Sequence, residues 1–160
     1  MKHQMKLFSL IIRLIAVSLA LLLTNTISAK PENKLGDSLA PYKNAKSITV
    51  YAISEGILFN NAVLPGNVRK FAKLEFTFAA GSQDWNVFWD VADRTSFTGG
   101  ATPGDFRWAL LANSSAEHQT QILAVDRTAR IMFVNGHCLS ARGPLFKWLK
   151  SLRLQSRVQK

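Results

Sequence analysis

Four aspartates have the side chains and the spacing that hydrolytic chemistry could use. They lie within 22 residues of one another: Asp84, Asp90, Asp93 and Asp105. Clustered carboxylates can bind Ca²⁺ or divide the acid and base roles of hydrolysis. Their spacing matches no calcium-binding loop, however, and loop aspartates mainly serve turns and caps. They support a small secreted hydrolase as an alternative hypothesis, and we predict no metal site, no cofactor and no catalytic residue.

Cys138 is the only cysteine, and a thiol nucleophile would need a histidine within about 3 Å as its base. In an extended segment the neighbouring His137 points to the opposite face, so His118 is the remaining candidate in the domain. A lone cysteine is more often a small buried apolar group. Cys138 therefore belongs to the same hydrolase alternative. Two histidines and one cysteine are too few for the four ligands of a typical structural zinc site.

A basic segment at the C-terminus gives the sharpest indication of function. After Gly143-Pro144, apolar residues recur at three- and four-residue spacing, which predicts an amphipathic helix whose charged residues are all basic. Such a helix can bind an acidic protein or an anionic envelope surface, including peripheral contact with a membrane. We predict the partner-binding residues to be Lys147, Trp148, Lys150, Arg153 and Arg157. The alternative is that its apolar face packs on the sheet while its charges are solvated.

The first 29 residues have the three-part layout of a secretory signal. Lys2 and Lys6 precede an apolar run over residues 7–23, and small residues end at Ala29. We predict a signal peptide over residues 1–29, cleaved after Ala29. The alternative is an uncleaved single-pass membrane anchor, but Arg13 interrupts the apolar run and leaves too short a span.

The chain that remains after cleavage would have 131 residues and a charge of +7. An exported protein seldom meets nucleic acid, so we expect no nucleic-acid partner and favour an acidic one. One cysteine cannot form an internal disulfide. Exported proteins without a disulfide are common in the bacterial periplasm and rare among small eukaryotic secreted domains. We therefore expect an exported protein that is periplasmic or secreted. The sequence does not indicate an oligomeric state.

We predict that these residues are positioned by a single α+β domain over residues 47–160. A flexible leader over residues 30–46 would precede it. Alternating apolar residues over 73–91 predict a central β-hairpin that brings Phe76 and Phe78 against Trp85 and Trp89. We predict further strands over residues 47–53, 56–60, 121–125 and 130–134. We also predict a helical turn over 68–72, a loop over 92–104 and a turn at Asn135-Gly136. For residues 106–112 we predict a short helix after Asp105 as its N-cap, although Phe106, Trp108 and Leu110 also alternate as in a strand.

The predicted fold is thus an antiparallel sheet of about five strands built from hairpins, with the C-terminal amphipathic helix packed on one face. The function that the sequence favours is an exported, non-enzymatic protein-binding module that acts through this basic helix. An envelope accessory factor, an inhibitor or an immunity-type protein would fit that description.

Overall fold

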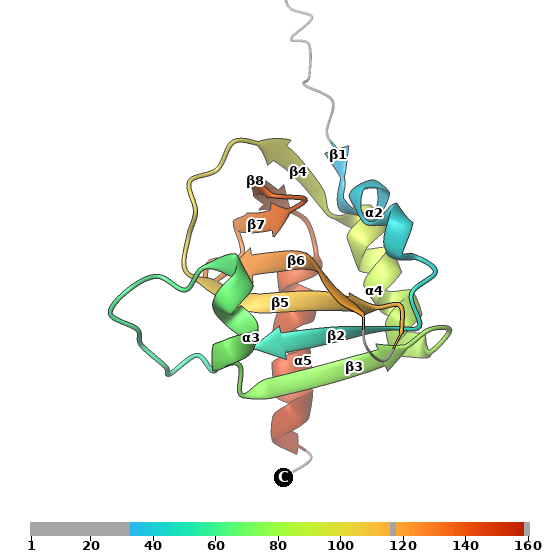
Figure 1. Ribbon diagram of the computed structural model, residues 1–160, viewed down its shortest axis with the longest axis horizontal. Helices are drawn as coiled ribbons and strands as arrows, with labels where there is room; N and C mark the ends of the chain where they lie inside the picture. Colours follow the sequence, from blue (N-terminus) through green and yellow to red (C-terminus); the bar gives the residue numbers. More distant parts are fainter. Residues whose placement is uncertain (1–32, 116–117, 159–160) are drawn as a thin grey trace, which may run out of the picture. The chain divides into compact units, whose positions relative to one another are not determined.

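One antiparallel sheet of eight strands organises the part of the chain that the computed structural model describes, residues 33–115 and 118–158, with side chains as far as Leu154 (Figure 1). The strands are β1 (Asn33–Lys34), β2 (Ser47–Ala52), β3 (Leu74–Ala79), β4 (Ser96–Gly99), β5 (Phe106–Asn113), β6 (Gln119–Asp126), β7 (Ile131–Val134) and β8 (His137–Arg142). Their order across the sheet is β1-β4-β8-β7-β6-β5-β2-β3. The antiparallel sheet and the mixed class are as predicted, but the sheet is larger than five strands.

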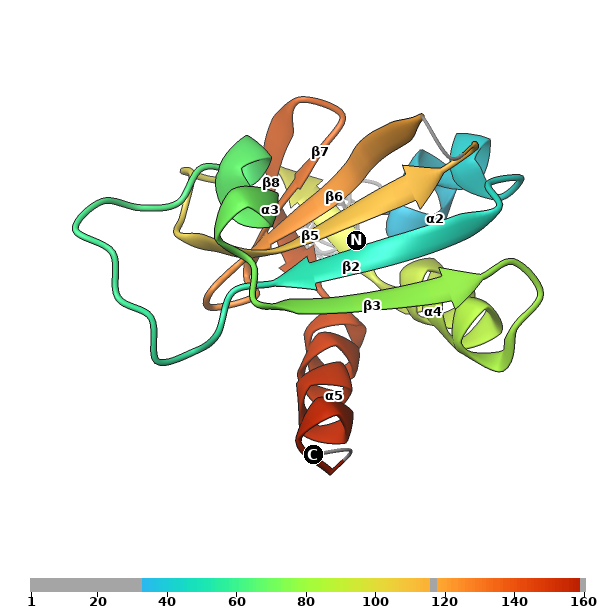
Figure 2. The same cartoon turned by 60° about the horizontal axis from the view of Figure 1, so that its bottom comes forward.

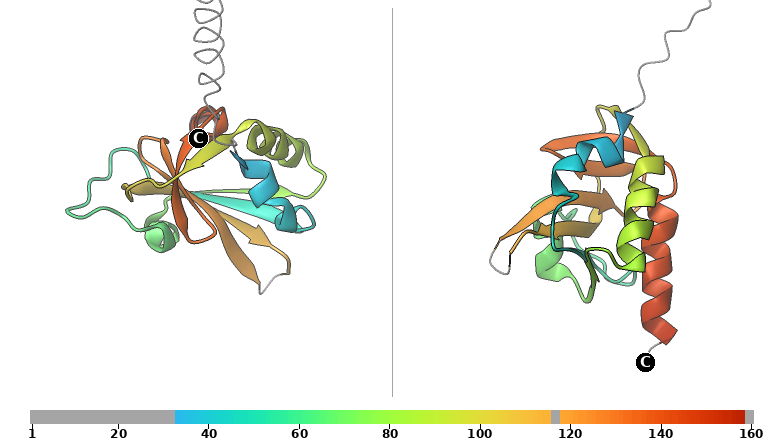
Figure 3. Two further views of the ribbon diagram at one scale, coloured as in Figure 1. Left: turned by 90° about the horizontal axis from the view of Figure 1, so that it is seen from above. Right: turned by 90° about the vertical axis from the view of Figure 1, so that its right-hand side faces the viewer.

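Helices cover both faces of this sheet. The described α-helices are α2 (Leu35–Ser38), α3 (Val68–Phe71), α4 (Gln83–Arg94) and α5 (Leu145–Val158), and the 3-10 helices are η1 (Ala40–Tyr42) and η2 (Pro65–Asn67). The helices α4 and α5 pack side by side on one face, and α3 lies on the other (Figures 2 and 3). Each face therefore has its own apolar core, and the predicted C-terminal helix is present on the larger one.

The second half of the predicted central hairpin is wrong, because residues 83–94 form helix α4. The hydroxyl oxygen of Ser82 accepts a hydrogen bond from the backbone N–H of Trp85 at 3.2 Å, which caps the helix N-terminus. Phe88 is completely buried between the neighbouring aromatic side chains, so the buried stripe follows helical spacing. The alternation of Trp85 and Trp89 with polar residues also fits a strand. In such a strand, however, Phe88 would point away from the face that carries the two tryptophans. The first predicted strand is present as β3, but it pairs with β2 and not with residues 85–91.

The predicted short helix over residues 106–112 is also wrong, since this segment is the central strand β5. It pairs with β2 on one side and with β6 on the other. Trp108 and Leu110 pack in the core beneath α4 and α5, whereas Phe106 and Leu111 pack in the core on the other face. A strand that is buried on both faces has no polar alternation, so its sequence resembles that of a short buried helix.

Other local predictions are confirmed. They are the strand β2, the helical turn α3, the hairpin of β6 and β7, the turn at Asn135-Gly136 and the C-terminal helix α5. The predicted strand over residues 56–60 is a loop, and β4 lies within the segment that was predicted to be a loop. The sequence also gave no indication of β8. Its residues are only partly buried or exposed, so no apolar periodicity marks it.

The segment predicted as a flexible leader, residues 30–46, belongs to the fold from Asn33 onward. It contains β1, α2 and η1, and the side chains of Leu35 and Leu39 are completely buried in the core beside α4. The predicted signal peptide lies outside the described residues. Within those residues, no helix has both the length and the apolar character needed to cross a membrane.

The start of α5 is fixed by a close backbone approach at Gly143. This residue has a φ of 126°, and a Cβ atom there would lie 2.8 Å from the carbonyl oxygen of Arg94, at the end of α4. Only glycine takes both the conformation and the contact without strain. The chain therefore leaves β8 and enters α5 directly against the end of α4.

Candidate functional site

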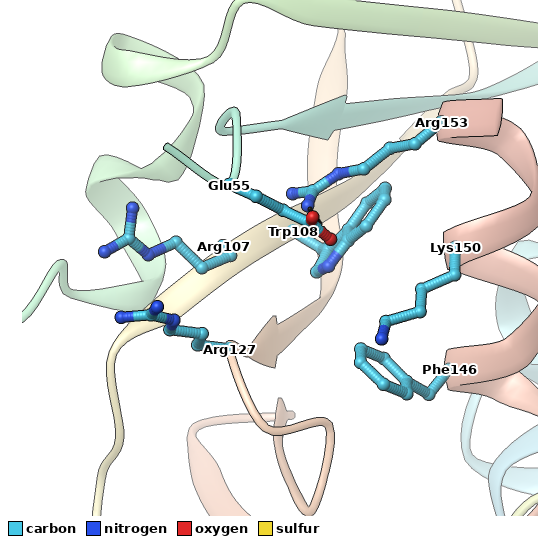
Figure 4. A pocket seen from close by; sticks show the side chains of 7 residues that line it. All are labelled: Glu55, Arg107, Trp108, Arg127, Phe146, Lys150 and Arg153. Carbon is cyan, nitrogen blue, oxygen red and sulfur yellow. Dashed lines mark ion pairs between the residues drawn. The ribbon is translucent and has the colours of Figure 1, made fainter. Parts of the chain in front are cut away.

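A pocket of about 250 Å³ lies where α5 meets the end of the sheet (Figure 4). Four elements contribute to it: the loop after β2, the strand β5, the turn after β6, and α5. Its walls carry four cationic side chains and one carboxylate, together with two aromatic rings. We call this the basic pocket, and it is lined by Glu55, Arg107, Trp108, Arg127, Phe146, Lys150 and Arg153.

Arg153 supplies a buried and fixed positive charge to the basic pocket. Its residue is only 8% exposed, and its guanidinium lies 4.0 Å from the ring centroid of Trp108. One guanidinium nitrogen donates a hydrogen bond to the carbonyl oxygen of Ile53, and Nη1 lies 3.0 Å from Oε1 of Glu55. A planar and weakly hydrated guanidinium tolerates such burial when it stacks on an aromatic ring and its N–H groups have acceptors.

Glu55 is held much less firmly than the arginine it contacts. Its side chain is 60% exposed, and it lies in the loop that follows β2, outside any helix or strand. Water competes for this exposed carboxylate, whereas the buried Arg153 keeps its contacts with Trp108 and with the carbonyl oxygen of Ile53 when the carboxylate moves. The carboxylate of Glu55 is therefore the partner of Arg153 that another carboxylate can most readily replace.

Arg107, in contrast, is fully engaged in holding the structure together. Its Nε and Nη2 donate to Oδ2 of Asp105 at 2.8 and 2.5 Å, and its Nη1 donates to the carbonyl oxygen of Ile57 at 2.8 Å. The guanidinium also lies 5.1 Å from the ring centroid of Phe59. Oδ1 of Asp105 accepts from the backbone N–H of Val63 at 3.0 Å. Arg107 thus holds the middle of the loop that carries Glu55, and Asp105 holds its end at Val63.

The remaining two cations of the basic pocket, Arg127 and Lys150, are exposed. Among the described residues, neither forms an ion pair with a carboxylate. Lys150 extends from α5 towards Phe146, with its Nζ 4.7 Å from the ring centroid, whereas Arg127 and Arg107 point away from α5 (Figure 4). Positive charge is therefore in excess at this site.

The structure separates the five predicted partner-binding residues by their position on α5. Lys150 and Arg153 line the basic pocket, and the exposed Lys147 borders a groove of about 330 Å³ between α4 and α5. Trp148 is 8% exposed and packs in the core, with its ring centroid 5.9 Å from that of Phe78 and 5.5 Å from that of Phe88. The side chain of Arg157 lies outside the described residues.

The four aspartates of the hydrolase alternative have separate structural contacts. Asp90 pairs with Arg94 within α4, Asp93 lies 4.0 Å from Lys43, and Asp105 holds Arg107. Asp84 lies in the first turn of α4, where a negative charge favours the helix N-terminus. In the described parts of the chain, no three His, Cys, Asp or Glu side chains are grouped so that they could hold a metal ion.

Cys138 and His118 lie in different parts of the sheet. Cys138 lies opposite Phe133 in β7, which in turn lies opposite Ala124 in β6. His118 precedes β6 at the far end, where its ring nitrogen Nδ1 is hydrogen-bonded to the hydroxyl of Ser115 at 3.1 Å. The rise of a strand, about 3.3 Å per residue, therefore places the thiol and the imidazole well beyond hydrogen-bonding distance.

Sequence reasoning missed five of the residues that line the basic pocket: Glu55, Arg107, Trp108, Arg127 and Phe146. They come from a loop, a strand, a turn and a helix, so no spacing in the sequence connects them. One usable signal was Arg107, which interrupts the otherwise apolar segment over residues 106–112. A charged residue within a buried strand must have partners, and this indicates a polar cluster.

A second hollow, beside β2 and β3, offers less for binding. It is bordered by Tyr51, Arg69 and Glu75, and the Tyr51 hydroxyl donates to Oε1 of Glu75 at 3.4 Å. Burial, followed by the negative charge of Glu75, raises the pKa of Tyr51 above its ordinary value. Its hydroxyl therefore stays neutral at physiological pH, and Glu75 offsets the charge of Arg69.

No protein-family model, curated protein or solved structure matches this chain. The described residues define a mixed α and β domain with one antiparallel sheet, whose C-terminal helix carries exposed lysines beside a basic pocket.

Proposed function

We propose that the protein is an exported, non-enzymatic binding module that holds an acidic protein against its C-terminal helix. The observation that carries this proposal is the division of α5 into two faces. Leu145, Leu149 and Leu152 are buried against the sheet, whereas Lys147, Lys150 and Leu154 are exposed. We call these three exposed residues the outer face of α5. Its two lysines have no carboxylate partner among the described residues, so they are available to a partner.

An acidic protein fits this surface better than a lipid bilayer does. A basic amphipathic helix binds a membrane by burying its apolar face at the headgroup boundary. In α5 that face already packs on the sheet, and the outer face has one large apolar side chain, Leu154, which is 62% exposed. A partner that presents carboxylates around a small apolar spot would match both the charge and the shape. Binding led by charge should weaken as salt is added.

Charge reversal on the outer face of α5 tests the proposal. The double variant Lys147→Glu, Lys150→Glu should bind a fluorescent octaglutamate peptide with blocked ends at least about tenfold more weakly than the unchanged protein does. Fluorescence anisotropy at low salt, repeated at about 150 mM, measures the affinity and its screening. The physical reason is that two attractive contacts become repulsive at the point of binding.

A matched control distinguishes binding at the outer face of α5 from attraction of the peptide to the protein's overall positive charge. Lys46→Glu, Lys73→Glu changes two exposed lysines outside α5 and alters the net charge by the same amount. We expect this control to lose no more than about threefold in affinity. Equal losses in the two variants would show that the peptide follows net charge alone. Binding to phosphatidylglycerol vesicles without binding to the peptide would instead support a membrane surface.

Export is the part of the proposal that rests on the sequence of residues 1–29. We expect the protein recovered from the envelope fraction of its source cell to have the intact mass of residues 30–160, since signal peptidase would cleave after Ala29. Mass spectrometry of the undigested protein measures this directly. A mass that corresponds to all 160 residues would contradict cleavage and would indicate a retained anchor.

A further inference from the structure

The contact between Glu55 and Arg153 shows which chemical group the basic pocket accepts. The Arg153 guanidinium is fixed by the Trp108 ring and by the carbonyl oxygen of Ile53, and the carboxylate of Glu55 lies against it at 3.0 Å. A guanidinium fork fits the two oxygens of a carboxylate well. The pocket therefore already binds one carboxylate, which comes from its own chain.

Two features make this internal carboxylate replaceable. Glu55 is mostly solvent-exposed and lies in a loop, so its removal exposes little apolar surface and breaks no secondary structure. Lys150 and Arg127 also remain without a carboxylate partner among the described residues, so the charge of Glu55 does not neutralise the site. A group with more negative charge, delivered with additional contacts, would compete successfully with Glu55.

We infer that the basic pocket is a carboxylate-binding site, filled by Glu55 in the free protein and by an aspartate or glutamate side chain of the acidic partner in the complex. The inference rests on the proposed function and gives it an anchor point. Lys150 belongs both to the outer face of α5 and to the basic pocket, so a partner that lies along the outer face also borders the pocket in which Arg153 lies. Glu55 then acts as an internal competitor that lowers the affinity for weakly acidic partners.

The substitution Glu55→Gln tests this inference, because it removes the competing charge and keeps the size of the side chain. We expect the variant to bind octaglutamate about three- to fivefold more tightly than the unchanged protein does. Asp90→Asn is the matched control. Asp90 is 61% exposed, it also pairs with an arginine, and its substitution changes the net charge by the same amount. It lies on α4 outside the pocket, and we expect a change of less than about 1.5-fold.

The side-chain Nε–H signal of Arg153, followed by NMR, locates the bound group. During titration with glutarate this signal should shift in both the unchanged protein and the Glu55→Gln variant, at lower glutarate concentration in the variant.

Equal affinities of Glu55→Gln and Asp90→Asn for octaglutamate, or an Arg153 signal that does not move, would overturn the inference. The proposed function would survive that result if Lys147→Glu, Lys150→Glu still bound weakly. A shift caused by inorganic phosphate at concentrations where glutarate has no effect would overturn the assignment to carboxylates.

Discussion

Replacing Phe88 with alanine is expected to lower the free energy of unfolding by about 3–5 kcal/mol, the range for a large aromatic side chain removed from a core. Phe88 is completely buried, and its ring centroid lies 5.0 Å from that of Trp89 and 5.5 Å from that of Trp148. It therefore joins α4 to α5. Its loss leaves a cavity between the two helices on the face of the sheet that they cover. Urea denaturation followed by tryptophan fluorescence measures the change.

Val87→Ala is the control that makes this experiment decisive for the fold. Val87 is 39% exposed on α4, and we expect its truncation to cost less than about 1 kcal/mol. In the β-hairpin that the sequence alternation predicts, Val87 would share a face with Trp85 and Trp89, and Phe88 would point the other way. A larger loss for Val87→Ala than for Phe88→Ala would therefore contradict the helix and favour the strand.

Replacing Arg153 with alanine is the second change for which we expect a large effect, about 2–4 kcal/mol of lost stability. The substitution removes the cation stacked on Trp108, worth about 0.5–2 kcal/mol, and leaves the buried carbonyl oxygen of Ile53 without this donor, at a cost of about 1–3 kcal/mol. The lost ion pair with Glu55 adds little, because that carboxylate is exposed to water. Urea denaturation is again the measurement.

Two further variants separate the charge of Arg153 from its position. Lys147→Ala removes an exposed cation from the same helix, and we expect a change within about 0.5 kcal/mol. Arg153→Lys keeps the charge but loses the planar group that stacks on Trp108, so its stability should lie between those of Arg153→Ala and the unchanged protein. If Arg153→Ala were no less stable than Lys147→Ala, the buried position of the guanidinium would be contradicted.

Helix α5 has two sides that require different residues. Its inner side must be apolar to cover the sheet, and Arg153 at the edge of that side holds the loop that carries Glu55. Its outer face must remain charged to serve the proposed function. A substitution such as Arg153→Ala will therefore alter both stability and binding, whereas changes at Lys147 test binding alone.

Several elements could be predicted because their signals are local. The residues of β2 are β-branched and aromatic, and the hairpin of β6 and β7 is closed by a turn whose residues are adjacent in the chain. In that turn, buried Asp126 accepts hydrogen bonds from the Thr128 hydroxyl at 2.7 Å and from the backbone N–H of Ile131 at 3.0 Å. Helix α5 follows from the three- and four-residue spacing of its apolar side chains after Pro144.

The sequence by itself therefore determined the antiparallel hairpin, the amphipathic C-terminal helix and the excess of positive charge, all of which depend on neighbouring residues. Only the tertiary structure decided that residues 83–94 are a helix, that β5 is a buried central strand and that Trp148 belongs to the core. It also decided that Glu55, Trp108 and Arg153 meet in one pocket. The physical reason is that burial and ion pairing depend on which distant segments pack together, and local periodicity does not specify this.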